Sequence, residues 1–419
     1  MVDIKEVLYD FNPWWREDFI LDFKEREVYK KIGDFIPLPQ MIAFTGLRRV
    51  GKTTLMLKIV EDAIKNNFDK KNIIYFSFDE FKDVELREII KVYENLMEKT
   101  FRGESYIVLF DEIQKLNNWE DQLKSIYDIF KGKVKIIISG SESLFIKKKS
   151  KETLAGRIFE FKIEPLSFKE FLAFKEVNFK PLGLYEKELI KLFKEFTFTL
   201  GFPELLNIKE KELIKKYVKE SIIERVVYKD ITALFNIKDI SILESLLNII
   251  IEDPGQIIEI SDLAKELKIS RQTVSNYLSY LEESFLIRKL YNFSNNKRKI
   301  ERKLKRYYPT IISVDTLFRD DDLSKSKVFE WLIVSQLKAE FFWRDTYKNE
   351  VDIILSNREI IPVEIKYGKL HFDGLLNFMR KFKINKGYII SFSMEGKHNF
   401  DGNNVDVIPA FKFLLRDNY

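Results

Sequence analysis

The segment Gly46–Thr53, with the sequence GLRRVGKT, constrains the fold more than any other part of the chain. It fits the pattern GxxxxGK[ST], and it stands between an apolar run, MIAFT, and a helix-like stretch, TTLMLKIVEDAI. In this context the glycines let the loop turn back, so that its N–H groups and the start of the helix face phosphate groups. We expect Lys52 to reach the β and γ phosphates and the Thr53 hydroxyl to bind Mg²⁺. The predicted nucleotide-binding residues are Gly46, Leu47, Arg48, Arg49, Val50, Gly51, Lys52, Thr53 and Thr54.

A second apolar run supplies the carboxylates that such a site requires. Residues 106–112 read YIVLFDE, a buried-strand pattern that ends in Asp111 and Glu112. The carboxyl ends of parallel strands meet at one edge of a sheet, so both acids are expected beside the loop. We assign Asp111 to Mg²⁺ and Glu112 to the water that attacks the γ-phosphate. The two motifs together predict a Mg²⁺-dependent ATPase, with ATP and Mg²⁺ as its cofactors.

Two further residues complete the predicted catalytic set of Lys52, Glu112, Ser141 and Arg157. Ser141 follows the strand-like run IIISG, where a sensor of the γ-phosphate would lie; the alternative is a simple strand-terminating turn. Arg157 is a candidate finger that would stabilise negative charge on the γ-phosphate, from its own subunit or from a neighbour. The alternative for Arg157 is an ordinary surface arginine.

Composition excludes several kinds of chemistry. The chain has no cysteine, which rules out disulfides, thiolate zinc sites, iron–sulfur clusters and cysteine nucleophiles. With 71 basic and 66 acidic residues the net charge is only +5, so a nucleic-acid surface would need local clusters of basic residues. No apolar run reaches the roughly 18 residues of a spanning helix, and the N-terminus carries acids where a signal peptide carries bases. We therefore expect a cytoplasmic protein without membrane contact.

Changes in pattern along the chain divide it into five parts. Residues 37–165 alternate β-branched runs with helix-like stretches, as in an α/β fold with a parallel sheet. The pattern then becomes mostly helical, passes through a helix-turn-helix-like unit and ends rich in strands. The expected parts are an N-terminal lead (1–36), a P-loop ATPase core (37–165), a helical lid (166–238), a winged helix-turn-helix (239–310) and a restriction-endonuclease-like α/β domain (311–419).

The helix-turn-helix pattern lies in residues 260–278, where Ser261 and Ser270 are expected as N-caps of its two helices. Outward residues of the second helix suit phosphates and base edges; they are Arg271, Gln272, Ser275 and Asn276. A basic segment, Asn295–Arg306, follows as a candidate wing, with Lys297, Arg298, Lys299, Arg302 and Lys303 as its predicted DNA contacts. The alternatives are a solvated loop, and a winged helix that docks protein or acts as an ATPase lid.

The C-terminal part carries charged residues at a restricted set of positions. Glu364 and Lys366 are two apart in a strand-like run, so both point to one face, and Asp352 begins the preceding run. This arrangement resembles the PD-(D/E)xK nuclease core. The resemblance implies that Asp352 and Glu364 bind Mg²⁺, that Lys366 orients the hydrolytic water, and that Glu330 is the acid on the preceding helix. Valine replaces the usual proline before Asp352 and no later glutamine is evident, so the alternative is an inherited fold whose acids are structural.

The order of the motifs resembles archaeal and bacterial AAA-type ATPases that carry a winged helix and a domain of unknown function behind the motor domain. The motifs are NPWW, GLRRVGKT, FDEIQ, ISGSES, LAGRIFEFKIEPLSFKEF and GFPELL. The resemblance implies an ATPase of the additional-strand, catalytic-glutamate (ASCE) class, related to the STAND group, some of whose relatives handle DNA. The leading hypothesis is an ATP-dependent DNA-binding protein of repair or processing. The alternative is a STAND-like switch whose C-terminal modules bind protein partners. A monomer suffices if Arg157 acts in its own subunit, and a small homo-oligomer is required if it acts in a neighbour.

Overall fold

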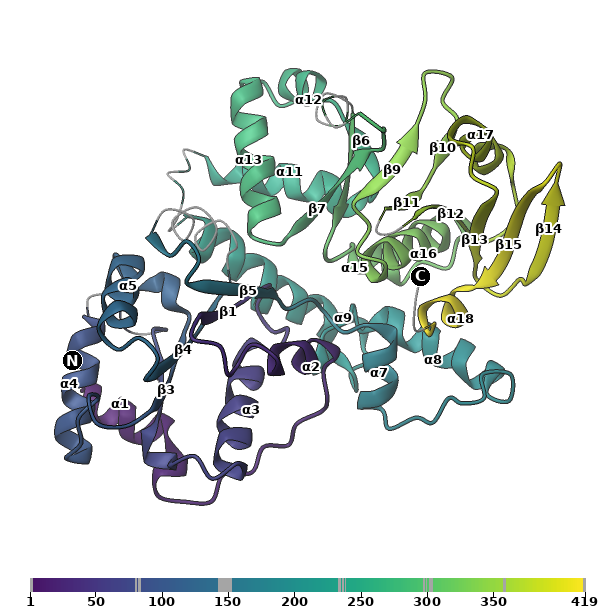
Figure 1. Ribbon diagram of the computed structural model, residues 1–419. Coiled ribbons are helices and arrows are strands. Elements are labelled where there is room, and N and C mark those ends of the chain that lie inside the picture. Colours follow the sequence, from purple (N-terminus) through teal and green to yellow (C-terminus); the bar gives the residue numbers. More distant parts are fainter. Residues whose placement is uncertain are drawn as a thin grey trace. The chain divides into compact units, whose positions relative to one another are not determined.

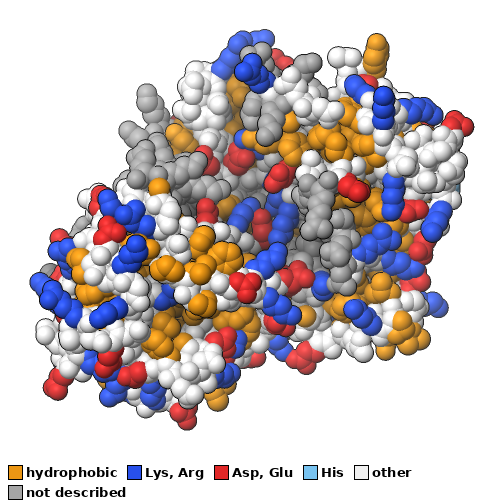
Figure 2. All heavy atoms as spheres, viewed as in Figure 1, with side chains coloured by type: hydrophobic (Ala, Val, Ile, Leu, Met, Phe, Trp, Pro, Cys, Tyr) orange, Lys and Arg blue, Asp and Glu red, His pale blue; other side chains and the backbone are white. Residues whose placement is uncertain are grey.

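The computed structural model describes residues 3–79, 81, 84–141, 153–232, 235, 237, 239–296, 298, 300, 304–356 and 359–416. The chain divides into two compact units, Met1–Glu164 and Pro165–Tyr419. Within the described ranges, no helix is both long and apolar enough to cross a membrane. On the face drawn in Figure 2, basic and acidic side chains are interspersed, which agrees with the small net charge of +5.

The first unit is built on a five-stranded parallel sheet with the order β2-β3-β4-β1-β5; Figure 1 labels β3, β4, β1 and β5. Strand β4 therefore separates the strand before the GxxxxGK[ST] loop from the strand that ends in Asp111. Strands β1, β2 and β3 are buried throughout, as is usual when helices cover both faces of a parallel sheet. The strands are β1 (Met41–Thr45), β2 (Ile73–Ser77), β3 (Tyr106–Asp111), β4 (Val134–Gly140) and β5 (Ile158–Lys162).

The N-terminal lead covers the edge strand β2. The Asn12 amide bonds the Tyr75 carbonyl at 2.9 Å and accepts from the Tyr75 N–H at 2.7 Å. The indole N–H groups of Trp14 and Trp15 both donate to the Ile73 carbonyl. The NPWW motif thus satisfies backbone groups that an open edge would leave unpaired. The helices of this unit are α1 (Ile4–Phe11), η1 (Pro13–Trp15), α2 (Glu27–Gly33), α3 (Lys52–Lys65), η2 (Lys70–Asn72), α4 (Leu86–Met97), η3 (Ile113–Lys115) and α5 (Trp119–Ile129).

The second unit begins with helices, as the sequence predicts. A capping box starts the first of them, because Ser167 and Glu170 each accept from the other's backbone N–H. Two consecutive π-helical stretches follow, which the sequence pattern does not predict. The elements are α7 (Phe168–Phe174), α8 (Glu186–Phe198), η4 (Pro203–Leu205), α9 (Lys211–Lys216), η5 (Tyr217–Ile223) and η6 (Arg225–Ile231).

The part expected to be a winged helix-turn-helix, residues 239–310, contains a helix, a strand, two helices and two strands. Ser270 caps the second of the paired helices by accepting from the Thr273 N–H at 3.0 Å. The expected cap at Ser261 is wrong, because the helix already includes Ile260, with Glu259 at the N-cap position. The elements are α11 (Ile240–Glu252), β6 (Gln256–Ile258), α12 (Ile260–Glu266), α13 (Arg271–Glu283), β7 (Ile287–Asn292) and β8 (Lys305–Pro309).

One sheet joins this segment to the C-terminal part. Its strand order is β10-β9-β7-β8-β6, and the parallel pair β7–β9 sets Tyr291 opposite Phe341. Strands on both sides of the boundary expected at residue 310 therefore share hydrogen bonds. The two added strands are β9 (Phe341–Arg344) and β10 (Glu350–Val351).

A second sheet, with the order β11-β12-β13-β15-β14, completes the unit. One hydrophobic core contains Trp343 of the first of these sheets, Ile389 of the second and Phe378 of the helix that follows β12. That helix therefore packs against both sheets. The strands are β11 (Ile353–Ser356), β12 (Ile360–Lys366), β13 (Lys386–Ser391), β14 (Gly396–Phe400) and β15 (Asn403–Pro409). The helices are α15 (Val314–Leu317), α16 (Asp322–Gln336), α17 (Asp373–Phe382) and α18 (Ala410–Leu414).

Candidate functional site

The GxxxxGK[ST] loop connects β1 to α3 and depends on two glycines. Gly46 has a φ of +143°, and a Cβ atom there would lie 2.2 Å from the Ile163 carbonyl oxygen. Gly51, just before α3, has a φ of +95°. Lys52 is only 5% exposed, and its Nζ donates to the Gly46 and Leu47 carbonyls at 3.0 and 2.9 Å. The predicted loop is therefore formed, with the lysine ammonium held against its backbone.

Arg26, in the N-terminal lead, supports the loop. Its guanidinium is buried and donates to the Val50 and Glu164 carbonyls, each at 2.8 Å. Arg26 thereby links Val50, the residue before Gly51, to Glu164, which follows β5. Sequence reasoning missed Arg26 because a single arginine far from the motif forms no pattern.

Asp111 lies at the carboxyl end of β3 and accepts hydrogen bonds from three hydroxyl groups. Its Oδ2 accepts from Thr53 Oγ1 at 2.6 Å and from the Tyr75 hydroxyl at 2.7 Å, and its Oδ1 accepts from Ser139 Oγ. Burial and the charge of Asp111 raise the pKa of Tyr75, which keeps its hydroxyl proton available to donate. The structure thus brings Thr53 and Asp111 together. Tyr75 was missed because it stands inside an apolar strand, and Ser139 because Ser141 of the same run was chosen as the sensor.

Glu112 and Ser141 are linked by a side chain that the prediction did not include. Gln114 Nε2 donates to Glu112 Oε2 at 2.6 Å and to Ser141 Oγ at 3.1 Å. Glu112 itself adopts a left-handed conformation, with a φ of 53°, and its N–H donates to Ser139 Oγ at 3.1 Å. Such backbone conformations in non-glycine residues are uncommon and cluster at functional sites. Gln114 is part of the FDEIQ motif, so its place in that motif was the available signal.

Arg157 does not lie near the loop. Its carbonyl accepts from the N–H of Met41, the first residue of β1, at 2.8 Å. Because β1 and β5 are parallel, Arg157 is at the amino edge of the sheet, opposite the edge that carries the loop. Its Nε pairs with Asp128 Oδ1 at 3.2 Å. This geometry does not support a finger role within the same subunit.

The predicted DNA-contacting residues on α13 share its outward face. Arg271, Gln272, Ser275 and Asn276 are all exposed, and the Gln272 amide bonds Asn276 Oδ1 at 2.8 Å. Arg298 of the basic segment is also exposed. The remaining predicted contacts, Lys297, Lys299, Arg302 and Lys303, fall outside the described residues.

The four residues of the predicted nuclease-like site converge from α16, the β10–β11 junction and β12. Lys366 Nζ pairs with Glu364 Oε1 at 2.7 Å. Asp352 Oδ2 accepts from the Ile365 N–H at 2.8 Å, and Glu330 Oε1 accepts from the Tyr308 hydroxyl at 2.6 Å. Burial and the charge of Asp352 raise the pKa of Glu364 to about 8, and the same two causes raise the pKa of Glu330. We call Glu330, Glu350, Asp352 and Glu364 the carboxylate cluster.

Arg306 lies within the carboxylate cluster. The sequence places it at the end of the basic segment, but the side chain is buried, with Nη1 3.7 Å from Glu330 Oε1 and 3.6 Å from Asp352 Oδ1. Its Nη2 pairs with Glu350. Among the described residues, no group of three or more acidic or histidine side chains is arranged to hold a metal ion. With a guanidinium on Asp352, the cluster does not fit the Mg²⁺ expected between Asp352 and Glu364.

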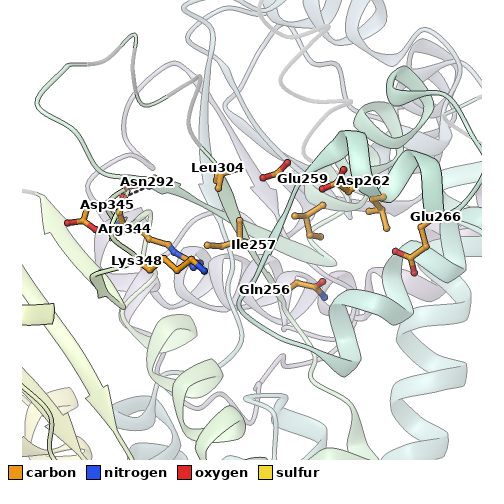
Figure 3. Close-up of a pocket in the computed structure, with 12 residues that line it drawn as sticks. Gln256, Ile257, Glu259, Asp262, Glu266, Asn292, Leu304, Arg344, Asp345 and Lys348 are labelled. Atoms are coloured by element: carbon orange, nitrogen blue, oxygen red, sulfur yellow. Dashed lines mark hydrogen bonds between the residues drawn. The ribbon is translucent and has the colours of Figure 1, made fainter. Parts of the chain in front are cut away.

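A separate cavity of about 580 Å³ lies between α12 and the β9–β10 turn (Figure 3). Carboxylates at the start and along α12 lie on one side of it, and Arg344 and Lys348 lie on the other. Strand β6 supplies part of its lining between them. The carboxylates are Glu259, Asp262 and Glu266.

These features define the first unit as a P-loop domain of the AAA type, and comparison with known families agrees. The AAA domain family matches residues 39–172, and two domains of unknown function, DUF8612 and DUF4143, match residues 190–311 and 326–413. The chain is 30% identical to uncharacterized protein MJ1544 of Methanocaldococcus jannaschii, over 95% of each chain. It belongs to the same family as that protein.

Other relatives extend the comparison. Uncharacterized protein MJ1637 of the same organism is 27% identical over 90% of this chain and 85% of its own. An uncharacterized protein of Haemophilus influenzae is 28% identical over 64% and 65%. Among solved structures, the ADP form of the Aeropyrum pernix ORC2 protein matches with a TM-score of 0.36 and 11% identity, covering 77% of this chain and 98% of that one.

Proposed function

We propose that this protein binds and hydrolyses ATP with Mg²⁺ and uses the nucleotide state to control DNA binding in repair or processing. The observation that carries the ATPase proposal is the 2.6 Å hydrogen bond between Thr53, at the start of α3, and Asp111, at the end of β3. It brings the two oxygen donors expected for Mg²⁺ next to a formed phosphate loop. Few protein ligands are needed there, because Mg²⁺ in such sites is bound largely by phosphates and water.

Each residue has a definite task in this proposal. Thr53 and Asp111 would hold Mg²⁺, which would neutralise charge on the β and γ phosphates. Lys52 would exchange the Gly46 and Leu47 carbonyls for phosphate oxygens. Glu112 would orient the attacking water, and Gln114 would keep that carboxylate beside Ser141.

Paired variants test the hydrolysis proposal. Lys52→Ala should abolish nucleotide binding, whereas Glu112→Gln should retain it and lose about 100-fold or more of turnover, since only the water-positioning group is removed. Binding of a fluorescent ATP analogue and phosphate release would be measured. Glu88→Gln, exposed on α4, is the matched control and should behave as the parent. Equal turnover in Glu112→Gln and the parent would refute the assignment.

The proposed DNA contact rests on the second unit. Strand β8 pairs antiparallel with both β6 and β7, and with α11, α12 and α13 this order supports a winged helix. The face of α13 opposite its buried side carries four exposed side chains suited to phosphates and bases. Anisotropy titrations with single-stranded, duplex and branched DNA, with and without ATP, are the test. We expect binding that weakens with salt, and its absence would remove DNA from the proposal.

A regulatory switch with a protein partner is the second candidate. The observation that favours it is the α12 side of the cavity, where Glu259, Asp262 and Glu266 would repel phosphate groups and suit a basic segment, while Arg344 and Lys348 line the opposite side. This candidate gains support if the titrations show no salt-sensitive DNA binding while ATP turnover remains.

The C-terminal part is proposed to be a PD-(D/E)xK-like core. The order α16, β9, β10–β11, β12, α17 and β13, with acids on α16 and β12 and a lysine on β12, supports that assignment. The proposal concerns the fold of this part and does not include DNA cleavage.

A further inference from the structure

We propose that Arg306 takes the place of a divalent metal ion in the carboxylate cluster, so that this centre is neutralised from within and binds neither Mg²⁺ nor Mn²⁺. The inference does not depend on the proposed ATPase activity or DNA contact, because it rests on distances among the side chains of the carboxylate cluster. The cluster then has acids where the proposed PD-(D/E)xK-like core would have them, and an arginine side chain where that core would bind a metal ion.

The position of the guanidinium carries the first step. One nitrogen, Nη1, lies 3.7 Å from Glu330 Oε1 and 3.6 Å from Asp352 Oδ1, and it also donates to the Tyr308 hydroxyl at 3.4 Å. A metal ion bound to those two carboxylates would have to lie beside Nη1, which is within ion-pair distance of both. It would also be repelled by a charge that arginine does not lose in proteins.

The second step is that Arg306 is held in this position. Its backbone is in the middle of a sheet, since β8 sets Arg306 opposite Leu290 of β7 and Ile257 of β6. Its Cζ lies 5.0 Å from the centroid of the Phe342 ring, and Nη2 pairs with Glu350. Strand pairing, ring contact and ion pair fix the guanidinium from separate directions.

Two further cations lie against the cluster. Lys366 pairs with Glu364, and Arg344 Nε lies 3.5 Å from the second oxygen of Glu350. Glu364 Oε2 is buried and accepts no hydrogen bond from any described residue. That oxygen is the ligand that an incoming ion would gain if Arg306 were removed. Removing the arginine should therefore create the metal site that the parent protein lacks.

The test is a Mn²⁺ titration of the full chain without nucleotide, with free Mn²⁺ followed by electron paramagnetic resonance. Parent and Asp352→Asn should give the same isotherm, because Asp352 binds no ion in the parent. Arg306→Met should bind one additional Mn²⁺, and Asp352→Asn in that background should remove it. Removing one positive charge about 4 Å away corresponds to a gain in affinity on the order of 100-fold or more. Arg319→Met, an exposed arginine of the same unit, is the matched control and should gain no site.

Two results would overturn the inference. One is a Mn²⁺ ion bound by the parent and absent from Asp352→Asn, which needs no change at Arg306 and so is decisive even if Arg306→Met fails to fold. The other is a folded Arg306→Met protein that gains no ion. Arg306→Lys, which keeps the positive charge, should remain without the additional ion.

Discussion

At the residue scale, Gly46 shows how closely the loop backbone passes the chain that follows β5. A methyl group at this position would meet the Ile163 carbonyl oxygen at 2.2 Å, and the φ of +143° disfavours any side chain. We predict that Gly46→Ala lowers the free energy of unfolding by about 2 kcal/mol or more and abolishes ATP binding. Urea unfolding and nucleotide titration would measure both. Gly33→Ala, where nothing lies within 4 Å of the added methyl, should be close to neutral. Normal ATP binding by Gly46→Ala would contradict the account.

Glu61 on α3 should make the first unit sensitive to acid. It accepts from Lys58 at 2.7 Å, from the Leu21 N–H at 3.1 Å and from Lys65 at 3.0 Å. The hydrogen bond from Lys58, with those from Leu21 and Lys65, lowers the pKa of Glu61 to about 2 despite burial. A lowered folded-state pKa means stability that is present above about pH 4.5 and is lost as pH falls toward 2.

The corresponding variant is Glu61→Gln. It should be less stable than the parent at pH 7, and the difference in free energy of unfolding should shrink between pH 4.5 and 2. Denaturant unfolding of both proteins across this range measures the difference, with Glu88→Gln as the exposed control. A difference that is independent of pH would mean that the Glu61 charge contributes nothing.

The positions of some candidate-site residues could be predicted from the places of their motifs along the chain. Thr53 and Asp111 were placed correctly beside each other, since a loop motif and a strand end specify one edge of a parallel sheet. Tyr75 and Arg26 contact the same site from segments that carry no motif, and Ser139 belongs to the run from which Ser141 was chosen as the sensor. In the sequence, Arg306 cannot be told apart from the other basic residues of Asn295–Arg306. The pairing of β8 with β6 and β7 places its side chain among the carboxylates.

At the element scale, the basic segment should contribute to DNA binding through its positive charge. Neutralising Lys297, Arg298, Lys299, Arg302 and Lys303 should weaken binding to every sequence and reduce the log–log salt slope by about 0.9 for each DNA phosphate that the variant no longer neutralises. The buried Arg306 is left unchanged in this variant. Salt-dependent anisotropy titrations measure the slope. Neutralising the exposed Lys187 and Lys191 on α8 is the control. An unchanged slope would show that the segment is only solvated.

Local elements were predictable where a local signal dictates them. Ser270 caps α13 because its hydroxyl can accept from the N–H three residues later, and the sequence shows that pattern. The start of α12 was misplaced, because Glu259 occupies the N-cap without any side-chain hydrogen bond and so leaves no capping signal in the sequence. The β7–β9 pair was not predictable, since it joins residues far apart in the chain and depends on packing rather than on local pattern.

At the scale of the whole molecule, the two compact units should respond differently to nucleotide. All the residues proposed to bind ATP or to sense its γ-phosphate lie within residues 1–164. Saturating ATP at about 100 times its dissociation constant should add about 2.7 kcal/mol to the unfolding free energy of that unit. Calorimetry should show one transition that rises by several degrees and one that does not. Lys52→Ala should show no such shift. A single transition that shifts as a whole would mean that the two units unfold together.

The parallel pair β7–β9 also bears on how such a protein can be assembled from ancestral pieces. The matches to the two domain families of the second unit are separated by residues 312–325, yet one sheet contains strands from both sides of that interval. A gene segment that begins after residue 311 would supply β9 without its partner β7, and the carboxylates Glu330 and Asp352 without Arg306. Recombination between relatives at this point would separate a cation from its anions. Residues from both sides of the interval must therefore be present in one chain for the carboxylates to face their cation.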